Sequence, residues 1–433
     1  MAEVAFVRHE MEPPQAPPSG QVGPARWLRE NLFSSWLNAL LTIASVALLW
    51  WLVSHMLPWF AHGVWNAGSL TECRQIIQAT WGEGASGACF AVIRERWQQF
   101  LFGFYPVHLY WRPTLTFFLL LAALAPVLVS ELPRRLLWFS AAFPGLCYWL
   151  LWGGSLWVPI AIYAGFVVGH LAQRLLAAAG YGLVAPFAAA LATVLWWLYL
   201  VGPVADAFAS VVPLALTPVA SKLFGGFMLS TVIGMTGIAF SLPLGVLLAL
   251  GRRSDMFIVK ALSIGFIEFI RGVPLITLLL VATFLLNVFL PPGTNFDIIL
   301  RVIIMVTLFA AAYMAETIRG GLAALPRGQY EAADALGLDY WKSMRLIIMP
   351  QALKISIPSI VGNFISLFKD TTLVAIIGLL DPLGLVTSIR ADSNWNGIVW
   401  ELYGFVALLF LLCCYGMSQY SRYLERKLRT DRR

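Results

Sequence analysis

Long apolar runs separated by short polar segments form the main pattern of this chain. A helix that crosses a bilayer needs about 20 mostly apolar residues, and about ten segments meet this requirement. We therefore predict an all-α polytopic membrane protein with about ten transmembrane helices, or about eight if 136–205 contains a re-entrant segment. The predicted spans cover roughly 33–57, 113–130, two helices within 136–173, 175–205, 223–251, 257–290, 298–325, 352–380 and 400–420.

Composition supports an integral membrane protein and argues against a nucleic-acid partner. The chain has 433 residues, of which 60% are hydrophobic and 12% charged, whereas soluble domains average about 25% charged residues. The net charge is +7. No basic stripe interleaved with aromatic residues accompanies this charge, so we expect no nucleic acid to bind.

The positive charges alternate between the two sides of the predicted spans. Lys and Arg concentrate in cytoplasmic loops of membrane proteins, and opposite loops carry few of them. This rule places both termini in the cytoplasm. The cytoplasmic clusters are then 26–29, 134–135, 174, 252–253, 327–345 and 422–433.

The chain divides into a front half without recognisable motifs and a back half that carries them. Residues 1–30 are predicted to be a disordered cytoplasmic tail and 426–433 a basic cytoplasmic tail. Residues 31–222 form a transmembrane extension with an outer loop at 58–112. That loop is long enough for a docking element or a passive spacer, and 93–104 fits a helix on the membrane surface.

Cys73 and Cys89 flank a polar turn in this outer loop. Outside the cytoplasm they could form a disulfide, and the alternative is two free thiols. The other three cysteines lie in apolar runs, where a cysteine usually packs as a small core residue. No cysteine or histidine spacing suggests a metal site.

A polar segment at 331–350 interrupts the apolar back half; it reads E-A-A-D-A-L-G-L-D-Y-W-K-S-M-R-L-I-I-M-P. Good helix formers around Glu331 predict a short helix, which Gly337 would end in a left-handed conformation. Asp339 is a predicted cap of a second helix. The alanines Ala332 and Ala333 would let a partner surface approach closely. Pro350 marks the return to the membrane.

Several charged residues lie within the predicted spans, where each costs at least about 2.5 kcal/mol unless it is paired or faces water. Glu268 and Arg271 share one helical face, and Glu316 and Arg319 repeat this spacing. A transported zwitterion needs an anion and a cation as partners. Alternatively, Glu268–Arg271, Glu316–Arg319 and Lys369–Asp370 could pair with each other. The candidate path residues are Glu268, Arg271, Glu316, Lys369, Asp370, Thr371 and Thr372.

Five segments in the back half resemble the transmembrane domain of ABC importer permeases of the polar amino-acid subfamily. They are G-G-F-M-L-S-T at 225–231, F-I-R-G-V-P-L at 269–275, A-E-T-I-R-G-G at 315–321, the segment at 331–350, and L-F-K-D-T-T-L at 367–373. The resemblance covers 223–425, a little under half the chain. The chain looks most similar to the M-type permease subunits of general L-amino acid transport systems. This resemblance is carried by the long N-terminal extension and by G-R-R-S at 251–254, F-I-E-F-I-R-G-V-P-L-I at 266–276 and M-P-Q-A-L-K at 349–354.

This resemblance implies a type I importer core of five helices and a permease subunit of an ATP-driven importer. The loop at 326–350 would be the EAA loop, which docks on a cytoplasmic ATPase through Glu331, Ala332, Ala333, Gly337, Asp339 and Pro350. A homologous second permease chain, two ATPase copies and a periplasmic amino-acid-binding protein would complete the assembly in the bacterial inner membrane, among its lipids.

The chain lacks the G-x-x-x-x-G-K-[ST] phosphate loop. We therefore expect a transport subunit without its own ATPase site, with ATP and Mg²⁺ bound by the partner ATPases. We expect no cofactor, metal or catalytic residues on this chain.

Two other functions fit some of the sequence features. An ion-coupled secondary amino-acid transporter would use the membrane carboxylates as ion sites, but it predicts two similar halves. A membrane enzyme would need a nucleophile–base or metal constellation, and the sequence offers none.

Overall fold

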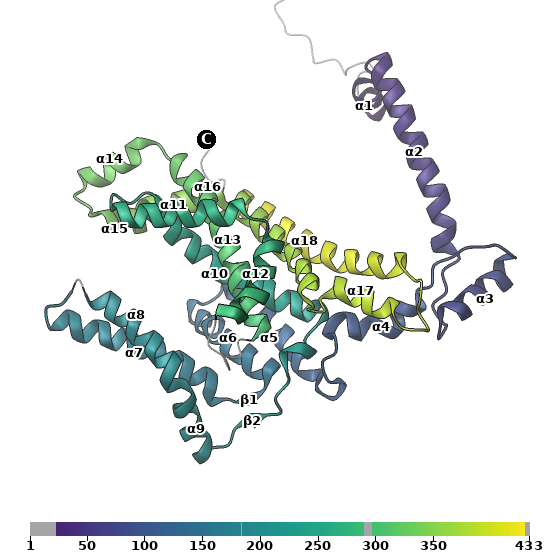
Figure 1. Ribbon diagram of the computed structural model, residues 1–433. Coiled ribbons are helices and arrows are strands. Elements are labelled where there is room, and N and C mark those ends of the chain that lie inside the picture. Colours follow the sequence, from purple (N-terminus) through teal and green to yellow (C-terminus); the bar gives the residue numbers. More distant parts are fainter. Residues whose placement is uncertain (1–22, 183, 290–296, 429–433) are drawn as a thin grey trace, which may run out of the picture. The chain divides into compact units, whose positions relative to one another are not determined.

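The computed structural model describes residues 23–182, 184–289 and 297–428, and this part of the chain is almost entirely helical (Figure 1). It divides into two compact units, Met1–Val92 and Ile93–Arg433. The predicted boundary near residue 222 is therefore not where the structure separates. Residues of 105–151 pack in the same core as residues of the back half. From the front half, this core contains Tyr105, Leu109 and Leu151; from the back half, it contains Phe224, Leu229 and Ile233.

The first unit contains one long membrane helix. Short helix α1 (Pro24–Asn31) falls within the tail that we predicted to be disordered, and residues 1–22 lie outside the described residues. Helix α2 (Trp36–Ala61) begins at Ser35, whose hydroxyl caps the first turn. Within this unit no residue of α2 is buried, as expected for a helix that is apolar on all sides and meets lipid or another protein. Helix α3 (Leu70–Trp81) follows.

Most of helix α4 belongs to the second unit and is followed there by the region of four predicted spans. Glycines on α7 allow α8 and the π-helical segment η4 to approach: a side chain at Gly165 would meet the indoles of Trp196 and Trp197. Helices α7 and α8 run side by side (Figure 1). The bounds are α4 (Ala91–Phe102), η2 (Val107–Leu109), α5 (Trp111–Leu128), η3 (Arg134–Leu136), α6 (Leu137–Trp152), α7 (Trp157–Ala178), α8 (Ala185–Leu195), η4 (Trp196–Leu200) and α9 (Val201–Val211).

A two-stranded antiparallel sheet joins the start of α7 to the segment after α9. Strand β1 (Gly154–Ser155) pairs with β2 (Ala215–Leu216), with Gly154 opposite Leu216. Nearby, the buried Arg112 donates to the carbonyl of Thr217 at 2.7 Å. These contacts fix the last segment of the front half beside the helices that begin the back half.

The back half is built around α10 and α13, which pack along each other (Figure 1). Small residues make this possible: a side chain at Gly245 of α10 would lie 2.6 Å from Met314 of α13. The bounds are η5 (Ser221–Leu223), α10 (Gly226–Arg252), α11 (Phe257–Gly272), α12 (Leu275–Phe289), α13 (Ile298–Ala323), α14 (Arg327–Ala335), α15 (Tyr340–Ser343), η6 (Met344–Ile348), α16 (Met349–Asp370), η7 (Thr371–Ile377), α17 (Pro382–Arg390) and α18 (Trp400–Leu428).

Among the described residues, eight helices are long and apolar enough to cross a membrane, or nine with a bent pair. The structure thus contains fewer complete spans than the ten we predicted, within the predicted lower limit. Two segments account for the difference. Helix α6 has only 16 residues. The predicted span 257–290 is broken into α11 and α12, which meet at 102° next to Pro274.

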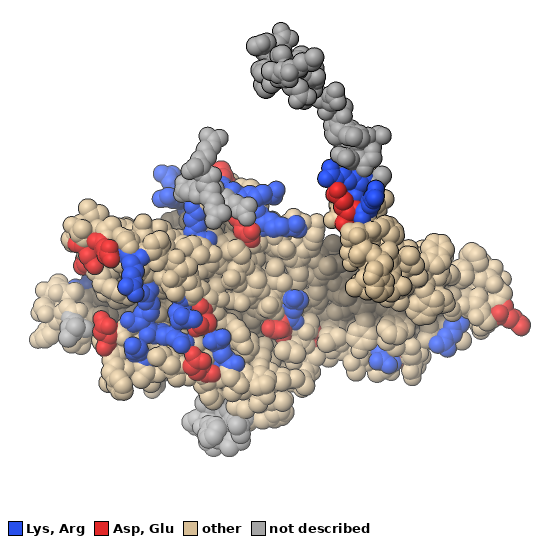
Figure 2. All heavy atoms as spheres, turned by 90° about the horizontal axis from the view of Figure 1, so that it is seen from above, with Lys and Arg blue, Asp and Glu red and all other residues tan. Residues whose placement is uncertain are grey.

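The surface is mainly uncharged, as lipid contact requires. On the face shown in Figure 2, Lys, Arg, Asp and Glu gather in a few clusters separated by wide areas without them. Large apolar side chains are exposed along most spans. This distribution agrees with a multi-pass membrane protein.

Candidate functional site: a docking loop and a charge cluster

The polar loop after α13 folds as two short helices around a glycine turn. Helix α14 begins after Pro326, and Gly337 ends it with φ = 67°, the left-handed conformation that the sequence predicts. The amides of Gly337 and Leu338 donate to the carbonyls of Asp334 (2.9 Å) and Ala333 (3.2 Å). These bonds satisfy carbonyls at the helix end.

Asp339 caps the second helix, α15, as predicted. Its carboxylate accepts the backbone amide of Lys342 at 2.8 Å and lies 3.1 Å from the Lys342 ammonium. The backbone hydrogen bond and the ammonium together hold the pKa of Asp339 below its usual value. Helix α15 continues through the π-helical η6 into α16, and Pro350 is exposed in the first turn of α16.

The loop exposes large apolar side chains. Leu336 is 72% exposed, Trp341 68% and Leu346 64%, although the surrounding segment is polar. Glu331 and Ala332 are also exposed. Exposed apolar clusters of this kind mark protein or membrane contacts.

One predicted docking residue lies on the inner side of the loop. Ala333 is completely buried, whereas Ala332 faces outward. Helix α14 packs on η6, and adjacent helical residues point in directions about 100° apart. Only Ala332 of the predicted alanine pair can therefore meet a partner directly, and Ala333 positions α14 against the rest of the chain.

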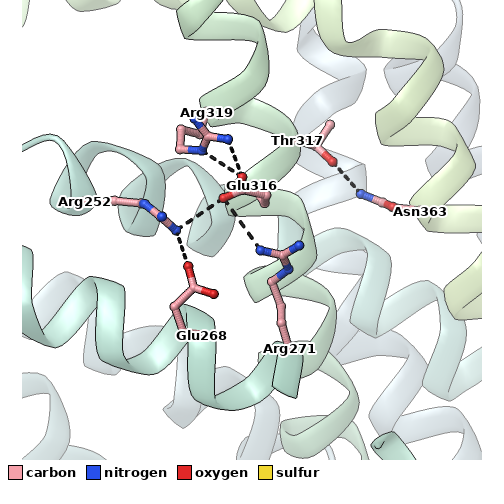
Figure 3. A network of polar contacts seen from close by, with 7 residues as sticks. All are labelled: Arg252, Glu268, Arg271, Glu316, Thr317, Arg319 and Asn363. Carbon is pink, nitrogen blue, oxygen red and sulfur yellow. Dashed lines mark hydrogen bonds and ion pairs between the residues drawn. The ribbon is translucent and has the colours of Figure 1, made fainter. Parts of the chain in front are cut away.

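A cluster of five charged side chains lies near the ends of α10, α11 and α13 (Figure 3). Glu316 is at its centre: Arg252 Nη1 donates to Glu316 Oε2 at 3.3 Å, Arg319 Nε donates to Oε1 at 2.8 Å, and Arg271 Nη1 lies 3.8 Å from Oε2. Arg252 also donates to Glu268 at 2.8 Å. We call Arg252, Glu268, Arg271, Glu316 and Arg319 the charge cluster.

The pairing differs in part from the prediction. Glu316 and Arg319 form an ion pair as expected. Glu268, however, bonds to Arg252, and Arg271 contacts Glu316 and lies over the ring of Tyr313, 5.6 Å from its centre. Contacts between helices replace the predicted pair along one helix, because the end of α10 brings Arg252 between the two glutamates.

The predicted path residues separate into two groups at different levels along α10. A side chain at Gly234 of α10 would contact Phe368, beside Lys369, whereas Arg252 is the last residue of the same helix. Eighteen residues of helix span about 27 Å. Lys369–Thr372 therefore lie far along the membrane from Glu268, Arg271 and Glu316.

Lys369 and Asp370, which we placed within the predicted span 352–380, lie at the end of helix α16. The α-helix stops at Asp370 and continues as the 3-10 segment η7. Lys369 is exposed, Asp370 is half-buried and Thr371 is fully buried. Nothing in the residue pattern indicates this change of helix type, because 352–380 is apolar on both sides of the charges.

Sequence reasoning missed Arg252, Arg253 and Tyr330. It treated the two arginines only as markers of a cytoplasmic loop. Arg253 Nη1 donates to the Tyr330 hydroxyl at 3.0 Å, and that hydroxyl donates to the carbonyl of Leu322 at 3.2 Å. The adjacent arginines at the end of a predicted span were the available signal, because a guanidinium there reaches several helix ends.

The segment of the first unit that follows α2 contains a disulfide. Cys73 and Cys89 are bonded to each other and fully buried. Beside them, the amide of Val64 donates to the carbonyl of Ala88 at 2.8 Å. Within the part of the chain that the structure describes, no group of three or more His, Cys, Asp or Glu side chains could hold a metal ion.

The apolar helices and a family model together define the class of protein. Residues 241–430 match the binding-protein-dependent transport system inner membrane component, which makes this chain a multi-pass transport permease.

The relatives identify the family within this class. The chain is 60% identical over 441 residues to the glutamate/glutamine/aspartate/asparagine transport system permease protein BztC of Rhodobacter capsulatus, covering 100% of both chains. It is 38% identical to the inner membrane amino-acid ABC transporter permease protein YhdY of Escherichia coli, over 94% of this chain and 93% of that one. The chain therefore belongs to the amino-acid ABC transporter permeases, and not to the ion-coupled transporters.

Solved structures match a little under half of the chain. A crystal structure of an amino acid ABC transporter with histidines is 28% identical, covers 46% of this chain and 90% of that chain, and has a TM-score of 0.42.

Proposed function

We propose that this permease pairs with a homologous second permease chain, rests on two copies of a cytoplasmic ABC ATPase, and receives amino acids from a periplasmic binding protein. The ATPases would bind ATP and Mg²⁺, and this chain would bind no cofactor. It would lie in the bacterial inner membrane with both termini in the cytoplasm, because the basic loops share that side.

The observation that carries the proposal is the exposed apolar surface of the loop at 326–350. Leu336, Trp341 and Leu346 would each be unfavourable in water, whereas a partner protein that covered them would gain about 1.5–3 kcal/mol for each fully buried side chain. Glu331 lies beside them and offers a charge for a basic group. Gly337 and Asp339 hold the two short helices in a fixed geometry, as a coupling element requires.

We propose polar amino acids as the substrates, including the glutamate and aspartate types named for the BztC relative. Glu268 and Glu316 are already paired with Arg252, and Arg271 with Glu316, within the charge cluster. Lys369 forms no ion pair within the described ranges and is exposed, so it is the better candidate for a substrate carboxylate, with Asp370, Thr371 and Thr372 beside it.

Substitution of Gly337 by Asp tests the docking role. The change costs about 1–2 kcal/mol in backbone strain and places a charge on the docking loop, so the chain should fold but transport should uncouple from ATP hydrolysis. The measurement is substrate-stimulated ATPase activity and uptake in the reconstituted complex. Gly180→Asp is the control, because Gly180 also has positive φ (89°) and open surroundings but lies between α7 and α8.

Normal stimulated ATPase activity in Gly337→Asp would contradict the docking role.

Substitution of Lys369 by Ala tests the proposed substrate path. Lys369→Ala should lower the initial rate of amino-acid uptake, since it removes the cation that would pair with the substrate carboxylate. Unchanged uptake in both Lys369→Ala and Arg271→Ala would exclude either residue from the path.

A further inference from the structure

Tyr330 attaches docking helix α14 to the ends of two membrane helices. Its hydroxyl accepts from Arg253, which follows α10, and donates to Leu322 near the end of α13. The Arg253 guanidinium also lies over the Tyr330 ring, 5.4 Å from its centre. The ring packs against the core formed by α10, α13 and α16. A shift of α14 therefore acts on Arg253 through both the hydroxyl and the ring.

Arg252, the preceding residue, holds the charge cluster. It bonds to Glu268 of α11 and Glu316 of α13 through the same nitrogen. Arg252 is the last residue of α10, and the Arg253 amide still bonds to the carbonyls of Leu250 and Gly251. The backbones of the two arginines are therefore parts of one rigid helix end. A movement of the backbone at Arg253 also displaces the backbone at Arg252.

A hollow of about 380 Å³ borders this contact. It is lined by Arg253, by residues at the end of α13, and by residues of α14 that include Tyr330 and Asp334. The hydrogen bond from Arg253 to the Tyr330 hydroxyl connects the end of α10 to α14 at this hollow. Ala333 and the Tyr330 ring pack α14 against the rest of the chain.

We propose that Tyr330, Arg253 and Arg252 form a polar link that transmits movement of docking helix α14 to the charge cluster and so positions α11 against α13. The inference rests on the proposed docking of an ATPase on this loop. Exposed ion pairs contribute only about 0–1 kcal/mol to stability, so the link serves coupling more than folding. Tyr330 and the two arginines are positioning residues and need not touch the substrate.

The experiment uses the complete transporter in proteoliposomes and measures amino acids transported per ATP hydrolysed. Tyr330→Phe removes one hydroxyl, and Arg252→Gln removes the cation that joins the glutamates. Each should lower the transport ratio by about fivefold or more, with assembly and thermal stability retained. Tyr423→Phe is the matched control, because Tyr423 also lies beneath a cation, Lys427 at 5.7 Å, but on α18.

The double variant Tyr330→Phe/Arg252→Gln separates a link from two independent contacts. If the residues act in series, the double variant is no worse than the worse single variant; if they act independently, the losses multiply. Multiplying losses, or an unchanged ratio in Tyr330→Phe, would overturn the link. If the polar link is overturned but Gly337→Asp still uncouples transport from ATP hydrolysis in the same preparation, the docking role of the loop is retained. A complex that Gly337→Asp leaves fully coupled would instead contradict the docking role.

Discussion

Asp381 shows how one buried carboxylate affects stability. It lies outside the spans, between η7 and α17, is fully buried, and accepts from the amides of Leu383 (3.1 Å) and Gly384 (2.9 Å). Burial raises its pKa to about 6, although the two amide bonds oppose this shift. Desolvation therefore exceeds the benefit of capping.

We predict that this carboxylate makes the protein less stable as pH rises. The folded pKa is above the ordinary value of about 3.9, so the folded state binds more protons between about pH 4 and 6, and the free energy of unfolding falls across this window. The loss is about 3 kcal/mol when complete. Asp381→Asn keeps a capping oxygen and should remove this pH dependence. Thermal unfolding of both proteins from pH 4 to 7 measures it, and parallel pH curves would contradict it.

At the residue scale, the sequence indicated which charged residues lie within the spans but not which of them form ion pairs with each other. The i, i+3 spacing correctly paired Glu316 with Arg319, because both lie on one helix. It gave Glu268 the wrong partner, because Arg252 reaches that carboxylate from another helix. A contact between helices depends on their crossing, which spacing along one chain segment does not contain.

Among the elements, α13 and α16 depend on a neighbouring pair of glycines. A side chain at Gly321 would lie 2.5 Å from the carbonyl oxygen of Ala352, whereas one at Gly320 would meet nothing within 4 Å. Small residues at such contacts let membrane helices approach closely.

We predict that Gly321→Ala destabilises the protein by about 1–3 kcal/mol, because the backbone of α16 must move away. Gly320→Ala should be neutral or stabilising by up to about 1 kcal/mol, since alanine favours a helix. Denaturation of the two variants in the same detergent checks the difference. Equal stabilities would show that α13 and α16 do not pack in this way.

The apolar pattern located nearly every membrane helix, including α10, α13 and α18, because each buries or exposes apolar side chains on all sides. It could not locate the 102° bend between α11 and α12 or the end of α16 at Asp370. Hydropathy does not indicate the direction of a helix axis. The bend between α11 and α12 and the end of α16 both lie within largely apolar sequence.

At the scale of the whole molecule, the disulfide closes the segment that follows α2 in the first unit. Cys73 and Cys89 are 16 residues apart, and the rings of His62 and Trp81 in the same segment stack with their centres 4.1 Å apart. A disulfide persists in an oxidising compartment, which agrees with an extracytoplasmic position for this segment.

We predict that the double variant Cys73→Ser/Cys89→Ser loosens 62–92 selectively. Closing a loop of about 15 residues contributes about 3 kcal/mol. Protease added to the outer face of sealed membranes should therefore cut this segment faster, while the second unit keeps its thermal stability. Cys147→Ser is the control, because Cys147 is a free thiol in α6. Equal cleavage of the double variant and the control would contradict the prediction.

The sequence by itself determined the class of fold, the two short helices of the polar loop at 331–350, and four of the five residues of the charge cluster, namely Glu268, Arg271, Glu316 and Arg319. Hydropathy and local spacing are enough for these features, since they arise within single segments. Only the tertiary structure decided that the first unit ends at Val92, that Ala333 faces inward, and that Arg252 and Arg253 join the docking helix to the cluster. These features depend on contacts between distant segments, and packing, not local pattern, selects such contacts.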